Sequence, residues 1–270
     1  MNCCFENGIF PTKWKIANVT LIPKEGKDTS LPSSYRPICL LSCWEKVLDK
    51  LITKRLVDFL ENKRLISENQ FGFRRKRSTI DALRKAIEFV KDMKVNNKIV
   101  AMISLDTKNA FNSASWSDIK MLLNKHYVPK HFFKIFGNFL QNRSVLLENE
   151  MEPWKYNVGV PQGSCAGPIL WLLIANEALN KFGVDTEVKV QAFVDDFVVL
   201  IGSTAVYHFS QIGTSTLAKL EKWAEDFSLY FSHEKSKFTM FKHRKNITHI
   251  PTIKLLSKRI QYTKELKYLG

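Results

Sequence analysis

Two apolar segments separated by a pair of aspartates constrain the fold of this chain more than any other feature. Residues 188–193 and 197–201 each have the length and the apolar content of a strand, and Asp195 and Asp196 lie between them. A connection this short can join only antiparallel neighbours, because parallel strands need a long crossover. The sequence therefore predicts a hairpin with two carboxylates at its turn.

A third aspartate follows another apolar run. Residues 99–105 are continuously apolar apart from Ser104, which suits a buried strand, and the run ends in Asp106. A single aspartate at a strand end is ordinarily explained by a nearby cation or by an exposed turn. Three in this arrangement favour a metal site instead. If residues 99–105 lie beside the hairpin, Asp106 and Asp195 can bracket two Mg²⁺ ions about 3.5–4 Å apart, which suits in-line phosphoryl transfer.

The remaining pattern predicts an α+β protein in one compact unit with two lobes, since no clean linker interrupts it. The first forty residues are expected to be rich in loops, because four prolines punctuate them. Apolar residues at three-four spacing predict a helix through Leu48, Leu51, Ile52, Leu56, Phe59 and Leu60. A second helix is predicted to open with a capping box at Ser78–Asp81 and to carry Ile80, Leu83, Ile87 and Val90 on one face. Further helices are predicted at 116–125, 131–141, 166–181 and 217–227, with short strands on both sides of Glu150 and at 238–241.

The charge balance narrows the class of partner. Lysine and arginine outnumber aspartate and glutamate by 41 to 26, for a net charge of +15. Such an excess favours a polyanion, although a merely basic soluble protein is the alternative and an acidic membrane surface a weaker one. The five cysteines form no CxxC pair, which gives no support to a zinc site and suits a reducing compartment. No apolar run is long enough to span a membrane and no signal peptide is recognised, so an intracellular protein is expected.

Several motifs, in order along the chain, resemble those of reverse transcriptases from non-long-terminal-repeat (LINE-like) retrotransposons. The segments that resemble the palm motifs are Ser104–Asp106 with Ala110–Asn112, Gly159–Ser164 running on to Gly167–Trp171, and Ala192–Asp196. The segments that resemble the fingers signature are Trp14–Lys15, Ile22–Lys24, Gly26–Asp28, Ser34–Ile38 and Gln70–Arg74 with Ser78–Thr79. A lone Asp-Asp pair would be weak support, whereas this ordered series covers essentially the whole chain.

This resemblance implies a right-hand polymerase fold with helical fingers and a palm built on an antiparallel sheet. Residues 1–98 would form fingers that are incomplete at the N-terminus, and residues 99–270 the palm, with some finger segments near 115–157. The thumb is expected to be missing, and no endonuclease or zinc knuckle is expected. The implied activity is RNA-directed DNA polymerase, with an RNA template, a DNA primer and deoxynucleoside triphosphates as partners. A nuclear location is expected from the family, although no targeting signal is seen.

The same resemblance implies roles for individual residues. Asp106, Asp195 and Asp196 would be catalytic and would hold two Mg²⁺ ions, with Mn²⁺ as a substitute, and Thr107 would contribute only its backbone carbonyl. Nucleotide binding is assigned to Lys27, Arg36, Arg74, Phe111, Gln162, Gly163 and Lys235. Within that set the Phe111 ring would exclude a ribose 2′-hydroxyl, and Lys235 would be a general acid for pyrophosphate.

Departures from the family pattern keep two other interpretations open. Asn112 stands where the family commonly has aspartate, and Ser164–Gly167 reads Ser-Cys-Ala-Gly where the family often has Ser-Val-Leu-Gly. One alternative is a catalytically impaired fragment that acts only as a basic RNA- or hybrid-binding remnant. The other is an RNA-dependent RNA polymerase, which would not be expected to carry an aromatic gate at Phe111.

Overall fold

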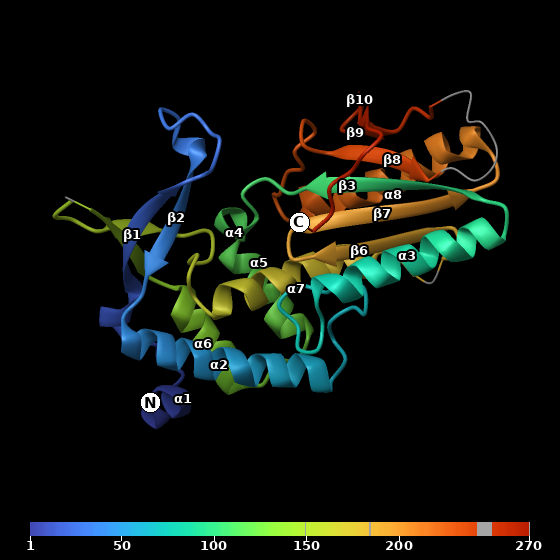
Figure 1. The fold of residues 1–270 in the computed structure, drawn as a ribbon. Coiled ribbons are helices and arrows are strands. Elements are labelled where there is room, and N and C mark those ends of the chain that lie inside the picture. Colours follow the sequence, from blue (N-terminus) through green and yellow to red (C-terminus); the bar gives the residue numbers. More distant parts are fainter. Residues whose placement is uncertain (149, 184, 242–249, 270) are drawn as a thin grey trace. The chain divides into compact units, whose positions relative to one another are not determined.

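The computed structural model describes residues 1–148, 150–183, 185–241 and 250–269 (Figure 1). Its helices are α1 Asn2–Asn7, α2 Cys43–Asn62, α3 Thr79–Val95, α4 Ala110–Ser113, α5 Trp116–Lys125, α6 Lys130–Leu140, α7 Ala166–Asn180 and α8 Val206–Asp226. Its strands are β1 Ile16–Pro23, β2 Tyr35–Leu40, β3 Ile99–Asp106, β4 Arg143–Leu147, β5 Trp154–Tyr156, β6 Val188–Phe193, β7 Asp196–Ser203, β8 Lys237–Phe241, β9 Lys254–Leu255, β10 Lys258–Arg259 and β11 Gln261–Tyr262. The mixture of helices and mainly antiparallel strands confirms the predicted α+β class.

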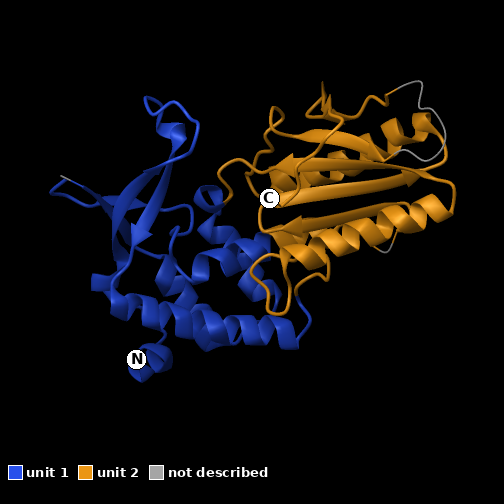
Figure 2. Ribbon diagram, in the orientation of Figure 1, with its two compact units in different colours: residues 1–65, 111–174 blue, residues 66–110, 175–270 orange. Residues whose placement is uncertain are grey.

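The chain divides into two compact units, coloured separately in Figure 2. Unit 1 comprises Met1–Leu65 and Phe111–Ile174, and unit 2 comprises Ile66–Ala110 and Ala175–Gly270. Each unit therefore takes segments from both sides of residue 98. The division into fingers at 1–98 and palm at 99–270 stays a prediction.

Unit 2 is built on a five-stranded sheet with the order β11-β8-β3-β7-β6. β3 lies between β7 and β8 and is antiparallel to both, and β6 pairs with β7 as the predicted hairpin. The register of β3 on β7 runs from Ile99 opposite Ser203 to Asp106 opposite Asp196. The C-terminal end of β3 and the N-terminal end of β7 thus meet at one end of the sheet.

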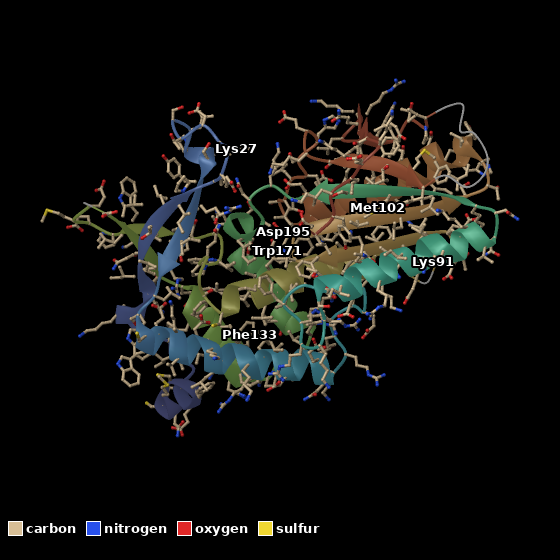
Figure 3. The ribbon with its side chains drawn as sticks, in the orientation of Figure 1. Lys27, Lys91, Met102, Phe133, Trp171 and Asp195 are labelled. Carbon is tan, nitrogen blue, oxygen red and sulfur yellow. The ribbon has the colours of Figure 1, made fainter. Side chains whose placement is uncertain are left out.

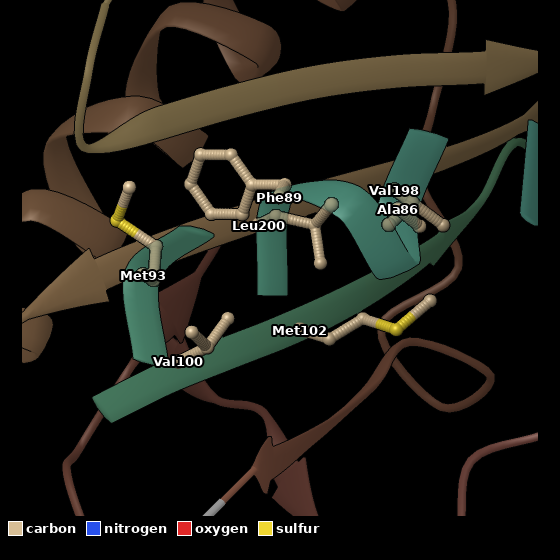
Figure 4. Close-up of a cluster of buried hydrophobic side chains, with 7 residues drawn as sticks. All are labelled: Ala86, Phe89, Met93, Val100, Met102, Val198 and Leu200. Atoms are coloured by element: carbon tan, nitrogen blue, oxygen red, sulfur yellow. The ribbon is translucent and has the colours of Figure 1, made fainter. Parts of the chain in front are cut away.

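Two helices cover opposite faces of this sheet. Figure 4 shows Phe89 and Met93 of α3 packed on Val100, Val198 and Leu200 of β3 and β7. On β7 the alternate side chains face the other way, because successive residues of a strand point to opposite faces. There the Phe197 ring packs against Trp223 of α8, with ring centroids 5.3 Å apart. The strands are buried on both sides, which explains their continuous apolar sequence.

The apolar face predicted for α3 is not the face that the fold buries. Ile80, Leu83 and Ile87 are exposed, and the buried positions are Ala82, Ala86, Phe89 and Met93, with Val90 half-buried. Both sets have helical spacing, and the set with small alanines lets the helix backbone approach the sheet closely. The capping box itself is confirmed, because Ser78 and Asp81 each bond the other's backbone N–H. Helix α8 also begins earlier than predicted, at Val206 rather than near residue 217.

Unit 1 contains a four-stranded sheet with the order β2-β1-β4-β5. Two of these strands lie in the first forty residues, where the sequence predicted loops, so that prediction is corrected. Pro37 is tolerated inside β2 because β2 is an edge strand, where a missing N–H costs no ladder bond on the outer side. The strands predicted around Glu150 are confirmed as β4 and β5, which are antiparallel. No helix among the described residues is both long enough and apolar enough to cross a membrane.

Helix α2 carries charged groups on its buried face. The predicted helix is confirmed, with Leu48, Ile52, Leu56 and Leu60 buried, Phe59 half-buried and Leu51 exposed. Glu45 and Asp49 are buried as well. The Asp49 carboxylate accepts hydrogen bonds from the backbone N–H groups of Cys165 and Ala166, at 2.5 and 3.0 Å. Asp49 thereby caps the start of α7 and anchors the turn that precedes it.

Candidate active site

The three predicted catalytic aspartates lie at one end of the unit 2 sheet. Asp106 is the last residue of β3 and is the register partner of Asp196, the first residue of β7. Asp195 occupies the turn between β6 and β7, at the sheet end where Figure 3 labels it. Residues 106 and 195 are 89 positions apart in the sequence, and pairing of β3 with β7 is what brings their segments together.

The turn has an unusual backbone. Val194 adopts a φ of 63°, in the left-handed region that a β-branched residue rarely enters. The Thr107 hydroxyl donates a hydrogen bond to the Asp195 carbonyl at 3.1 Å, which ties the end of β3 to the turn. The family resemblance implies only a backbone role for Thr107, and no motif indicates a role for its hydroxyl.

The local electrostatics disfavour charge on the paired acids. Burial is the largest cause that raises the pKa of Asp195, and the Asp106 carboxylate adds to it. Burial, then Asp195, then Asp106 raise the pKa of Asp196 to about 6, although part of the Asp196 surface still reaches solvent and moderates the burial. Lys235 opposes both shifts and donates to the Asp106 carboxylate at 3.0 and 3.3 Å. A bound cation would relieve the same repulsion.

The donor set is compatible with a divalent cation that substrate phosphates and water help to coordinate. Among the described residues, no group of three or more histidine, cysteine or acidic side chains converges closely enough to cage a metal. Mg²⁺ does not require such a cage, since it is commonly held by one or two carboxylates together with substrate phosphates and water. Burial and mutual repulsion raise the pKa values of these acids, and a bound cation would favour their ionised forms.

Unit 1 holds five of the predicted nucleotide-binding residues. Lys27 lies in the loop between β1 and β2, as Figure 3 shows, and Arg36 is exposed on β2. The Phe111 ring is half-buried and lies 6.2 Å from the Trp171 ring, centroid to centroid. Gln162 and Gly163 follow in the turn before α7, so the set is spread over the sheet, α4 and this turn.

The turn that carries Gln162 and Gly163 is tightly fixed. The Cys39 N–H donates to the Gln162 carbonyl at 2.7 Å, and the Gln162 amide donates to Asn112 Oδ1 at 2.9 Å. Gly163 has a φ of 116°, and a Cβ there would come within 2.6 Å of the Cys39 carbonyl oxygen. Only glycine fits this close approach. Asn112, noted as a departure from the family pattern, thus orients the Gln162 side chain.

A small apolar cavity adjoins this turn. Its volume is about 300 Å³, and its walls include Leu21, Pro37 and Cys39 of the sheet together with Asn112 and Gln162. The two amides are among its few polar groups. The cavity belongs wholly to unit 1.

Arg74 and Lys235 belong to unit 2 with the aspartates. The Arg74 guanidinium donates to the carbonyls of Ser67 and Gln70, at 2.7 and 3.3 Å. These hydrogen bonds connect Arg74 to the preceding residues of the same loop. Lys235 contacts Asp106, as described above. The roles predicted for both in nucleotide binding stay predictions.

The fold and this site define a class of protein, the polymerases of the right-hand fold. Solved telomerase structures from Candida tropicalis share that fold: one in complex with a fragment of telomeric RNA matches with a TM-score of 0.64 and 12% identity over 89% of this chain and 43% of that one. Another, without RNA and truncated from its C-terminal domain, matches with a TM-score of 0.61 and 14% identity over 88% of this chain and 52% of that one. At this identity the likeness concerns the fold alone.

The chain belongs to the reverse transcriptase (RNA-dependent DNA polymerase) family, whose model matches residues 22–270. It is 31% identical, over 99% of its length, to a Pol polyprotein of the R1 retrotransposable element of Bradysia coprophila, and 27% identical, over its whole length, to the RNA-directed DNA polymerase of the mobile element jockey of Drosophila melanogaster. It spans 26% and 30% of those relatives. These matches confirm the resemblance to non-long-terminal-repeat elements. Reverse transcriptases generally use divalent metal ions.

Proposed function

We propose that this chain carries the nucleotidyl-transfer centre of an RNA-directed DNA polymerase of a non-long-terminal-repeat retrotransposon. The observation that carries the proposal is the register of β3 on β7, which sets Asp106 opposite Asp196 with Asp195 in the adjoining turn. Family membership supports the same conclusion independently. A nuclear site of action belongs to this proposal through the family resemblance only.

In this proposal Asp106, Asp195 and Asp196 hold two Mg²⁺ ions, for which Mn²⁺ can substitute. When bound, such a pair stabilises the attacking and leaving oxygens of an in-line displacement. The chain's own residues bind and orient the reactants. Lys235 keeps an ammonium group beside Asp106, where it can give a proton to the departing pyrophosphate.

The remaining predicted residues are proposed to bind the nucleotide. Lys27, Arg36 and Arg74 supply cations for the triphosphate, and the Phe111 ring stands against the 2′ position of the sugar. Gln162, oriented by Asn112, presents its amide to the nucleotide. An RNA template and a DNA primer are the proposed polyanions. The net charge of +15 and the RNA present in one of the telomerase structures support that choice.

Primer extension on poly-rA/oligo-dT with Mg²⁺ tests the proposal. Asp106→Asn and Asp195→Asn should each reduce extension by on the order of a hundredfold or more, because each removes charge stabilisation at the reacting phosphate. Hybrid binding should persist in both variants. Asp92→Asn is the matched control, since Asp92 is exposed on α3 in the same unit.

Two results would overturn it. If the wild-type chain binds the hybrid but extends no primer, the hybrid-binding remnant becomes the better description. If it incorporates ribonucleotides as readily as deoxynucleotides, an RNA polymerase is favoured instead.

A further inference from the structure

A buried glutamine outside the proposed catalytic set contacts the turn that carries the paired acids. The Gln70 side chain has no exposed surface, and its Oε1 accepts hydrogen bonds from the backbone N–H groups of Gly72 and Val194, at 3.0 and 3.2 Å. Both partners are donors, so the amide can lie only with its oxygen toward them. One side-chain atom therefore joins the Gln70 loop to the turn before Asp195.

The loop that carries Gln70 is itself fastened to the sheet. The Phe71 N–H donates to the Ala192 carbonyl, and the Ala192 N–H donates to the Asn69 carbonyl, each at 2.9 Å. Residues 69–71 thus pair with β6, which is otherwise the edge strand of the five-stranded sheet. Gln70 is held rigidly at the base of the turn, and its position does not depend on a flexible loop.

The turn needs support from outside because its backbone is strained. Val194 holds a φ of 63°, a conformation that is unfavourable for a β-branched residue and persists only where its surroundings enforce it. Gly72 lies against this residue, and a Cβ at Gly72 would come within 2.4 Å of Val194 Cγ2 and 2.6 Å of its nitrogen. Gln70 accepts a hydrogen bond from Val194 in its left-handed conformation, and Gly72 leaves room for the Val194 side chain and backbone.

Simple core filling does not explain the choice of glutamine. Within the described part of the chain, Gln70 Nε2 is buried and has no hydrogen-bond partner. A buried donor left unpaired loses its hydrogen bonds to water without replacement, a loss of stability that an apolar side chain of the same size would avoid. The acceptor Oε1 is the part of the side chain that the turn uses.

We propose that Gln70 is a positioning residue for the catalytic turn. It holds the Val194 N–H and so sets the direction in which Asp195 and Asp196 leave the turn. The inference rests on the proposed function, in which these acids bind the metal ions. It gives the Gln70–Arg74 motif a role distinct from triphosphate binding.

The test compares Gln70→Met with Gln191→Met in the full 270-residue chain. Methionine keeps the length of the side chain and removes the acceptor. Gln191 is the matched control, since it is equally buried, in β6, but its Nε2 donates to the Ala82 carbonyl and the Tyr268 hydroxyl. Both variants lose buried polar contacts, so a general loss of stability should affect them alike.

Three measurements separate the two variants. In Gln70→Met, hydrogen exchange at the Val194 amide should speed up by about fivefold, the factor that corresponds to a net hydrogen bond of about 1 kcal/mol. Mn²⁺ affinity, measured by electron paramagnetic resonance, should fall. The rate of single-nucleotide addition should drop by on the order of a hundredfold with little change in nucleotide affinity, as expected for reacting groups displaced by about 1 Å. Gln191→Met should leave all three near wild type.

Unchanged exchange at Val194 in Gln70→Met, or equal losses in the two variants, would overturn the inference. If wild-type protein extends no primer, the proposed function fails by itself. Amide exchange and Mn²⁺ affinity then still decide whether Gln70 positions the turn.

Discussion

The buried ion pair of unit 1 gives a sharp prediction about stability. Arg143 at the start of β4 and Glu45 of α2 are 0% and 1% exposed, and their charged atoms lie 2.9 Å apart. Arg143 also donates to the Tyr156 hydroxyl at 3.0 Å and to the Phe139 carbonyl at 3.1 Å. Each of the three guanidinium nitrogens therefore donates a hydrogen bond inside the protein.

Removing one partner of the ion pair should lower the free energy of unfolding far more than removing both. Arg143→Met leaves the Glu45 carboxylate buried without its cation, and breaking a buried pair in this way costs about 3–5 kcal/mol. Glu45→Leu likewise leaves the Arg143 guanidinium buried without its counter-ion. In the double variant two apolar side chains fill the site, and such replacements are often neutral or better. We expect the double variant to be more stable than either single one, with a coupling energy of about 3 kcal/mol or more.

The cost of Arg143→Met should also depend on pH. Burial already raises the pKa of Glu45, while Arg143 lowers it, so loss of the arginine raises that pKa further. A carboxyl whose pKa is higher in the folded chain than in the unfolded one takes up a proton on folding, so lower pH stabilises the folded state. The penalty of Arg143→Met should therefore shrink as the pH falls from 7 toward the unfolded pKa of glutamate.

Urea-dependent hydrogen exchange of α2 and β4, read by mass spectrometry, measures this locally in unit 1. The whole chain need not unfold in one step for the comparison to hold. If the two single costs simply add in the double variant, the pair is not coupled and the reasoning is refuted. A penalty that grows at lower pH would refute the assignment of the orphaned charge to Glu45.

Three further predictions concern the site. Phe111→Val should raise ribonucleotide incorporation and leave deoxynucleotide use largely intact; equal discrimination in an extension assay would count against the gate. Asp195→Asn removes a like charge, so the pKa of Asp196 should fall below about 6 in a metal-free ¹³C NMR titration, while burial keeps it above that of a solvated aspartate. Gly72→Ala should destabilise unit 2 by about 1–3 kcal/mol in urea and shift the Val194 amide resonance, because its Cβ overlaps that residue.

The hairpin that carries Asp195 and Asp196 was predictable because its signals are local. Strand length, apolar content and a very short connection determine the β6–β7 pairing without reference to distant residues. Placement of Asp106 beside it needed only one further step, the assumption that the third apolar run is a neighbour. The capping box at Ser78 was predictable for the same reason, since its four residues contact one another.

Interactions between distant residues were not predictable from pattern alone. Either stripe of α3 satisfies helical spacing, and only the sheet decides that Ala82 and Ala86 face inward. Gln70 resembled part of a fingers motif, and nothing in the sequence indicates that its Oε1 reaches Val194 across 124 positions.

The sequence also does not show which basic residues are exposed, so the net charge overstates the number of cations that can contact a phosphate. Arg143 is fully buried in an ion pair, and the Lys15 ammonium is buried against Asn138, so neither is free to contact a phosphate. Burial, followed by the nearby Arg143, lowers the pKa of Lys15, which further weakens it as a partner for an anion. The number of phosphate contacts therefore cannot be read from the net charge of +15.

The salt dependence of hybrid binding should instead follow the exposed cations. The slope of log affinity against log salt concentration should steepen by roughly 0.9 for each exposed cation that contacts a phosphate. Lys15→Met should consequently leave that slope unchanged, whereas removal of the exposed Arg36 should make it shallower.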